Sequence, residues 1–200
     1  VGYHAVDLSE VANRGLRDEV PGDGEGGWTD EGENDMRFLP PGEWRINGVP
    51  FRIIDPEENG GRACVVLRGG VQPDPPFPER VSIPVRERLS KLHFLHTVTW
   101  GQRSGEVFRY ILHYTDGVTE EVPVVQGRSV ANWWWLGELP EAKLAWEGPN
   151  PAHERVRIWQ IEHEITHPAG AQAVLDRIEI ASTAGRPIPV VLAITGAYSN

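Results

Sequence analysis

Residues 163–167 read HEITH, which matches the H-E-x-x-H signature of zinc proteases. That signature requires an α-helix, because residues i and i+4 then lie on one face and two histidines can hold one Zn²⁺. Segment 154–168 instead alternates polar and apolar residues, is rich in β-branched side chains and ends at Pro168, which predicts a strand. His163 and His167 on a strand lie about 13 Å apart. We therefore predict a strand with surface histidines, and we expect no zinc.

Acidic and amide side chains crowd the segment WTDEGENDMR, where five of the six positions from 30 to 35 carry one. Oxygen atoms at such short spacing suit Ca²⁺, which takes about six to eight oxygen ligands. The candidate metal ligands are Asp30, Asn34 and Asp35. The alternative is that these side chains accept hydrogen bonds from the backbone of their own loop, as Asp and Asn do in turns.

Tryptophan is abundant, with 8 residues in the chain, and three of them are consecutive in the segment NWWW at 132–135. In an extended chain, Trp133 and Trp135 share one face and Trp134 takes the other, so we expect at least one ring to meet solvent or a ligand. Sugars pack their C–H faces on aromatic rings and bond planar polar groups through their hydroxyls. The candidate ligand-binding residues are Trp28, Asp30, Asn132, Trp133, Trp134 and Trp135. The alternative is that two of the three consecutive rings fill the core and the third covers an edge.

The composition points to one all-β domain over residues 1–200, because 22 Gly and 17 Pro favour many turns over long helices. A formal net charge of −10 disfavours nucleic acid as a partner. No apolar run approaches the ~20 residues of a membrane span. The lone Cys64 lies in an apolar run, so we expect a buried thiol. The chain starts at Val1 without a signal-peptide pattern, and we interpret it as a module of a longer protein.

The alternation of apolar residues predicts nine or ten strands joined by hairpins and by a long loop from Arg14 to Trp44. Trp28, Met36, Phe38 and Trp44 are expected to pin that loop to a core. Two β-rich runs flank residues 116–117, an Asp-Gly pair that predicts a type I′ hairpin turn, and the Asn-Gly pair at 47–48 is a second tight-turn signal. The predicted fold is an antiparallel β-sandwich of jelly-roll type.

Several segments together resemble the carbohydrate-binding, galactose-binding-like jelly-roll domains of bacterial polysaccharide-degrading enzymes. They are VDLSEVANRGLRDEVPGDGEGGWTDEGENDMRFLPPGEWRINGVPFRIIDPEENGGRACVVLRG, HYTDGVTEEVPV, NWWW, AWEGPNP, LDRIEIAST and PIPVVLAITG. The resemblance covers essentially the whole chain and rests on structural motifs. It implies a secreted or cell-surface, non-catalytic module that binds a neutral polysaccharide or oligosaccharide beside a linked catalytic domain, often with a structural Ca²⁺.

Two other functions remain open at this point. One is a metal-dependent glycan hydrolase on a β-sandwich, for which His113 and His93 across a hairpin are the candidate strand-borne histidines. With 29 acidic residues, candidate carboxylate pairs are unavoidable and say little, and no nucleophile elbow, phosphate loop or dinucleotide fingerprint is present. The other is a structural or adhesion domain whose tryptophans are all internal. Binding to glycans distinguishes the carbohydrate-binding module from the hydrolase and the structural domain. Metal analysis of the purified protein distinguishes a zinc site from a structural calcium site.

Overall fold

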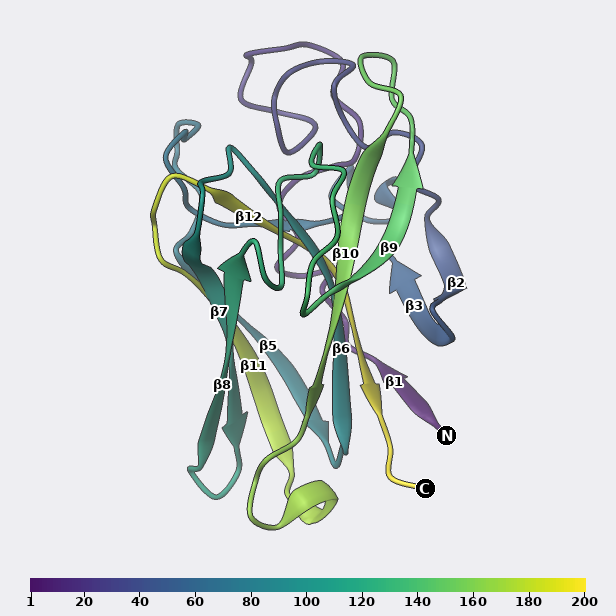
Figure 1. Ribbon diagram of the computed structural model, residues 1–200, viewed down its shortest axis with the longest axis vertical. Helices are drawn as coiled ribbons and strands as arrows, with labels where there is room; N and C mark the ends of the chain where they lie inside the picture. The colour runs from purple at the N-terminus through teal and green to yellow at the C-terminus, as the bar shows by residue number, and fades with distance from the viewer.

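The computed structural model describes residues 1–200, and its regular secondary structure consists almost entirely of strands joined by turns and loops (Figure 1). The strands are β1 (Tyr3–Ala5), β2 (Gly42–Ile46), β3 (Val49–Ile53), β4 (Val65–Val66), β5 (Arg80–Glu87), β6 (Lys91–Thr99), β7 (Gly105–Tyr114), β8 (Thr119–Gln126), β9 (Lys143–Gly148), β10 (Val156–Glu164), β11 (Leu175–Ser182) and β12 (Ile188–Ala197). Two short 3₁₀ helices, Pro56–Glu58 and Gly170–Gln172, are the only helices, and neither is long or apolar enough to cross a membrane.

Antiparallel pairing assembles these strands into two main sheets, which confirms the all-β sandwich; the jelly-roll type stays a prediction. The six-stranded sheet has the order β1-β12-β6-β10-β9, with β4 paired to β12 off this path. The four-stranded sheet has the order β5-β11-β7-β8. A separate hairpin of β2 and β3 lies beside the six-stranded sheet (Figure 1).

The core between the two main sheets is a cluster of 24 buried residues. Phe94 from the six-stranded sheet stacks on Tyr110 from the four-stranded sheet, with ring centroids 3.9 Å apart. His96 is fully buried beside them, where its Nδ1 accepts the Tyr110 hydroxyl at 2.8 Å and its Nε2 donates to the Ser129 carbonyl at 2.9 Å. Burial lowers the pKa of His96 to about 4, so this histidine is neutral at pH 7.

A second cluster of 20 buried residues covers the other face of the six-stranded sheet. It is built from the β2–β3 hairpin and from the long loop, and it explains why all ten positions of β12 are buried. Trp28 and Met36 anchor the loop in this cluster, as expected, and Trp44 packs against it. The expectation was wrong for Phe38, which is exposed. The long loop therefore packs on the outer face of the six-stranded sheet as a third layer.

The two predicted hairpin turns differ in type, although both occur. Asn47 and Gly48 have φ values of 49° and 81°, so this two-residue loop is the one with the type I′ signs of φ. At the β7–β8 turn, Gly117 has φ 88°, but Asp116 has no positive φ, so the type I′ prediction was wrong there. The Gly117 N–H donates to Tyr114 O at 3.0 Å, which gives a three-residue loop with glycine in the left-handed position.

The segment holding HEITH is a strand up to Glu164, as its period-two pattern predicted. His163 and His167 contact different carboxylates: Nε2 of His163 lies 2.9 Å from Glu120, and Nε2 of His167 lies 2.9 Å from Asp116. Both contacts tie the six-stranded sheet's β10 and its continuation to β8 and the β7–β8 turn. The prediction of surface histidines was wrong for His167, which is buried against the Tyr114 ring.

Candidate functional site

The consecutive tryptophans lie on a tight turn just beyond the end of β6. The Trp133 N–H donates to Val98 O at 3.1 Å, which fixes the turn to the sheet. The Asn132 side chain accepts the Trp134 N–H at 3.0 Å, and the Asn132 carbonyl accepts the Trp135 N–H at 2.8 Å. This Asx-type turn is typical of asparagine. The chain is therefore not extended here, so the alternation of faces that we predicted for the three rings does not apply.

The turn gives the three rings a different arrangement from the predicted one. Trp133 is fully buried, whereas Trp134 and Trp135 are 41% and 42% exposed. The expectation that at least one ring meets solvent is confirmed, but Trp135 does not share the burial of Trp133. Trp134 packs beside His153, with centroids 4.7 Å apart, and Trp135 lies 6.0 Å from the ring of Trp159.

Three of the predicted ligand residues serve the fold. Trp28 is buried, and its ring meets Trp133 edge-on at 5.5 Å, so neither ring has a face open to a ligand. The Asp30 carboxylate accepts backbone N–H groups from residues 22, 23 and 24 at 2.8–3.2 Å. Asp30 itself adopts φ 52°, a left-handed conformation that Asp tolerates. Through the contact of Trp28 with Trp133, the long loop and the NWWW turn meet.

A shallow surface hollow of about 170 Å³ lies next to this contact. Trp134 and Asn132 line it from the turn, and Trp100, which is 38% exposed, lines it from the end of β6. The remaining lining residues are Glu31, Thr99, Gly101 and Arg186. The hollow thus combines two exposed indole rings with a carboxylate, an amide and a guanidinium, and of the predicted ligand residues it includes Asn132 and Trp134 alone.

Trp100 is the most informative residue that the sequence reasoning missed. It follows directly after β6 and has φ 56°, which is strained for a bulky side chain and turns the chain sharply. The next residue is Gly101, where an added Cβ would lie 3.3 Å from the Asn132 side chain. A Trp-Gly pair at the end of a strand is the sequence signal that would have pointed to it.

Glu31 and Arg186 supply the opposite charges of the hollow. Burial raises the pKa of Glu31, while a hydrogen bond from Asn34 at 3.1 Å and the nearby His153 oppose that rise. Arg186 is exposed and forms no ion pair with the protein. Both side chains keep hydrogen-bonding capacity for a ligand that carries hydroxyl groups.

The predicted calcium ligands do not come together. Asp35 is buried and binds Arg37 through several hydrogen bonds of 2.9–3.1 Å. The Asn34 amide oxygen accepts from Asn150 at 3.1 Å. Asp30 instead lies with Asp18 and Asp23, whose carboxylate oxygens and that of Asp30 lie within 4.8 Å of one another. Asn34 and Asp35 are thus engaged by Asn150 and Arg37, and neither belongs to the carboxylate cluster around Asp30.

The triad of Asp18, Asp23 and Asp30 has the donor chemistry that Ca²⁺ prefers. Burial raises the pKa of the Asp18 carboxyl; the Gly32 N–H, which donates to it at 2.6 Å, lowers it, and the negative charges of Asp30 and Asp23 raise it again. A cation between the three groups would relieve this repulsion. The three carboxylates supply three oxygens, so backbone carbonyls and water have to complete the coordination.

The remaining histidine candidates lie in different sheets. Nδ1 of His93 on β6 is buried 3.8 Å from Glu162, too far for a hydrogen bond, whereas Nε2 of His113 on β7 lies 3.1 Å from Glu179 on the neighbouring strand β11 of the four-stranded sheet. The two histidines therefore do not form a common site. Cys64 is buried as expected, and burial raises its pKa far above the ordinary thiol value, which makes it a poor nucleophile.

Comparison of the chain with protein-family models, with curated proteins and with solved structures finds no match. We therefore infer the function from the residues of this chain and their arrangement. Among the sites described, the hollow with Trp100 and Trp134 is the one in which large aromatic rings are exposed beside free polar groups.

Proposed function

We propose that this protein is a non-catalytic carbohydrate-binding module, and that the hollow between Trp100 and Trp134 is its sugar site. The observation that carries the proposal is the exposure of both rings within one hollow that also holds Asn132, Glu31 and Arg186. Exposed tryptophan is costly unless a ligand covers it, and a pyranose ring offers the apolar C–H face that an indole binds.

The polar groups complete this recognition. A sugar stacked on an indole points its hydroxyls sideways, where the Glu31 carboxylate accepts and the Asn132 amide and Arg186 guanidinium donate. The hollow of about 170 Å³ has room for a single sugar unit and lies open at the surface, which suits the binding of one unit of a long chain. As part of the same proposal, the module acts outside the cell and holds a linked catalytic domain on a neutral polysaccharide.

A structural Ca²⁺ also belongs to this proposal, with its ligands moved to Asp18, Asp23 and Asp30. Calcium should raise the melting temperature of chelator-treated protein, because an ion that binds only the folded state stabilises it. Asp23→Asn should remove this gain, whereas Asn34→Ala should keep it. Equal gains in both variants would place the ion elsewhere, and no gain in the unmodified protein would remove calcium from the account.

The function is tested by titrating the protein with a panel of plant, algal and bacterial glycans while following its tryptophan fluorescence. Contact with Trp100 or Trp134 should change the emission, and the affinity should depend weakly on salt because stacking outweighs charge for a neutral sugar. Trp100→Ala should weaken the affinity at least tenfold. If no glycan perturbs the folded protein, the reading as a structural or adhesion domain replaces this one.

A further inference from the structure

Arg14 stands out among the charged residues because it is buried without an anionic partner. It is 7% exposed and is the only arginine among the buried residues. Its guanidinium forms no hydrogen bond or ion pair within the protein. It lies over the ring of Phe77, whose centroid is 5.1 Å from Cζ of Arg14. Arg37 shows the contrast, because its guanidinium binds Asp35 through several hydrogen bonds.

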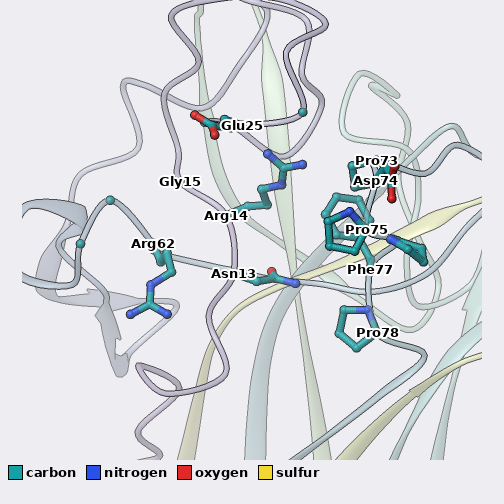
Figure 2. Close-up of a pocket in the computed structure, with 15 residues that line it drawn as sticks. Asn13, Arg14, Gly15, Glu25, Arg62, Pro73, Asp74, Pro75, Phe77 and Pro78 are labelled. Atoms are coloured by element: carbon teal, nitrogen blue, oxygen red, sulfur yellow. The ribbon is translucent and has the colours of Figure 1, made fainter.

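The Arg14 side chain extends into a pocket of about 500 Å³ beside the long loop (Figure 2). Figure 2 shows it rising between the loop that carries Glu25 and the segment from Pro73 to Phe77. This volume is within the ~300–1,000 Å³ typical of small-molecule sites. The hollow at Trp134 shares no lining residue with it, so the two are separate sites.

Glycines keep this pocket open. Five of its 15 lining residues are glycine, so much of its wall is bare backbone. At Gly15, an added Cβ would lie 2.6 Å from the Gly61 carbonyl oxygen, which shows how closely the two segments approach. The opposite wall consists of four prolines and Phe77, which present C–H surface. A ligand here meets backbone polar groups on one side and apolar surface on the other.

None of the charged residues around the pocket is an anionic partner for Arg14. Arg62 lies on the rim, but its Nε donates to the Asn59 carbonyl at 3.3 Å and its side chain turns away from Arg14 (Figure 2). Glu25 and Asp74 are exposed rim residues, and neither forms an ion pair with Arg14. The Arg14 guanidinium has no hydrogen-bond partner within the protein and none of its nitrogens is fully buried, so they face the water of the pocket. An oxyanion bound through two parallel N–H groups would take the place of that water.

We infer that the Arg14 pocket binds an acidic saccharide unit, with the guanidinium paired to its carboxylate or sulfate group. The size of the pocket suits a sugar better than a bare ion, and the wall of prolines and Phe77 accepts the C–H face of the ring. The saccharide identity rests on the proposed glycan-binding function, whereas the preference for an anion rests on Arg14. The inference adds an acidic unit to the otherwise neutral glycan of the proposed function.

The test compares three probes by isothermal titration calorimetry at low ionic strength: an oligogalacturonate, the same oligosaccharide with its carboxylates reduced to alcohols, and a sulfated galactan oligosaccharide. At least one anionic probe should bind, and Arg14→Met should weaken it at least tenfold while keeping the stem over Phe77. Arg177→Gln removes the same charge on an exposed strand residue and should leave the affinity unchanged. Glu25→Gln should strengthen the binding, because it removes a competing carboxylate.

Each outcome decides the inference. Uronate binding identifies a carboxylate ligand and binding of the sulfated probe alone identifies a sulfate ester, and both support the inference. Absence of binding by both anionic probes, or equal binding by Arg14→Met and the unmodified protein, overturns it. If neutral glycans still bind and depend on Trp134, the proposed function stands without the inference. If anions bind through Arg14 and Trp134→Ala does not change the affinity for any glycan, the inference about the Arg14 pocket stands and the proposed sugar site at Trp134 is contradicted.

Discussion

Each end of the sandwich carries a buried ionisable side chain, and the two side chains differ in their hydrogen bonding. At the hairpin end, formed by residues 113–120 and 163–172, Glu120 accepts hydrogen bonds from His163, from the Tyr114 hydroxyl and from the Thr166 N–H, all at 2.9–3.1 Å. At the loop end, formed by residues 13–37, 60–62, 73–78, 98–101 and 130–137, Arg14 has no such partner and three indoles are exposed. The ends lie far apart along the longest axis (Figure 1).

This difference distinguishes polar side chains that stabilise the fold from polar side chains that are free to bind a ligand. A buried polar group that is fully bonded contributes to stability, and its loss leaves its partners unsatisfied. An unbonded one lowers stability unless something outside the chain binds it. The motif HEITH belongs to the first kind: its histidines lock β10 and its continuation to the β7–β8 hairpin.

The largest effect is expected at Glu120. Glu120→Ala leaves the Tyr114 hydroxyl, the His163 imidazole and the Thr166 N–H without an acceptor, so we expect a loss of about 3 kcal/mol in unfolding free energy. Denaturant titration measures it. Glu121→Ala is the matched control, because Glu121 is half exposed, pairs with Arg109 and should cost less than about 1 kcal/mol. Equal losses in the two variants would contradict the distinction between paired and surface carboxylates.

A second prediction concerns pH and the buried His96. Its pKa in the fold is about 4, below the ordinary 6.5, so the unfolded chain binds more protons between these values. Stability should therefore fall as the pH drops from about 6.5 to about 4, by a total on the order of 3 kcal/mol from this residue. Imidazole resonances in NMR spectra should show His96 still neutral at pH 6.5 and below, with protonation only as the pH approaches about 4. A titration of His96 near pH 6.5 in the folded protein would refute its buried, neutral state.

A smaller effect is expected at the turn of the hairpin end. Gly117 has φ 88°, and Gly117→Val should destabilise the protein by about 1 kcal/mol or more, because a β-branched residue resists a positive φ. No other atom lies within 4 Å of the added Cβ position, so the effect is conformational and not steric crowding. Glycan binding should be unaffected. An unchanged melting temperature would mean that the turn adjusts without cost.

Local patterns predicted most of the strands, because alternation and turn chemistry act over a few residues, although twelve strands form where nine or ten were predicted. The strand at HEITH and the hairpins at Asn47-Gly48 and Asp116-Gly117 all occur. The turn type at Asp116 was missed, since the number of residues between paired strands decides it and sequence pairs alone do not.

The site was predicted only in part. Asn132 and Trp134 were found because of their residue types, but the fate of Trp28 and Trp133 depends on a third layer whose packing arises from distant segments. The Arg14 pocket was missed for a similar reason, because it joins loops that are separated by some fifty residues in sequence. No short-range pattern marks a cation that folding leaves unpaired.

Trp134 and Trp135 allow the most direct test of the central claim, since they are adjacent and equally exposed but only Trp134 lines the hollow. The measurement is the dissociation constant of Trp134→Ala and of Trp135→Ala for a glycan that the unmodified protein binds. The account predicts at least a tenfold weakening, about 1.4 kcal/mol, in Trp134→Ala and less than a twofold change in Trp135→Ala. Equal affinities in both variants, or a loss confined to Trp135→Ala, would contradict it.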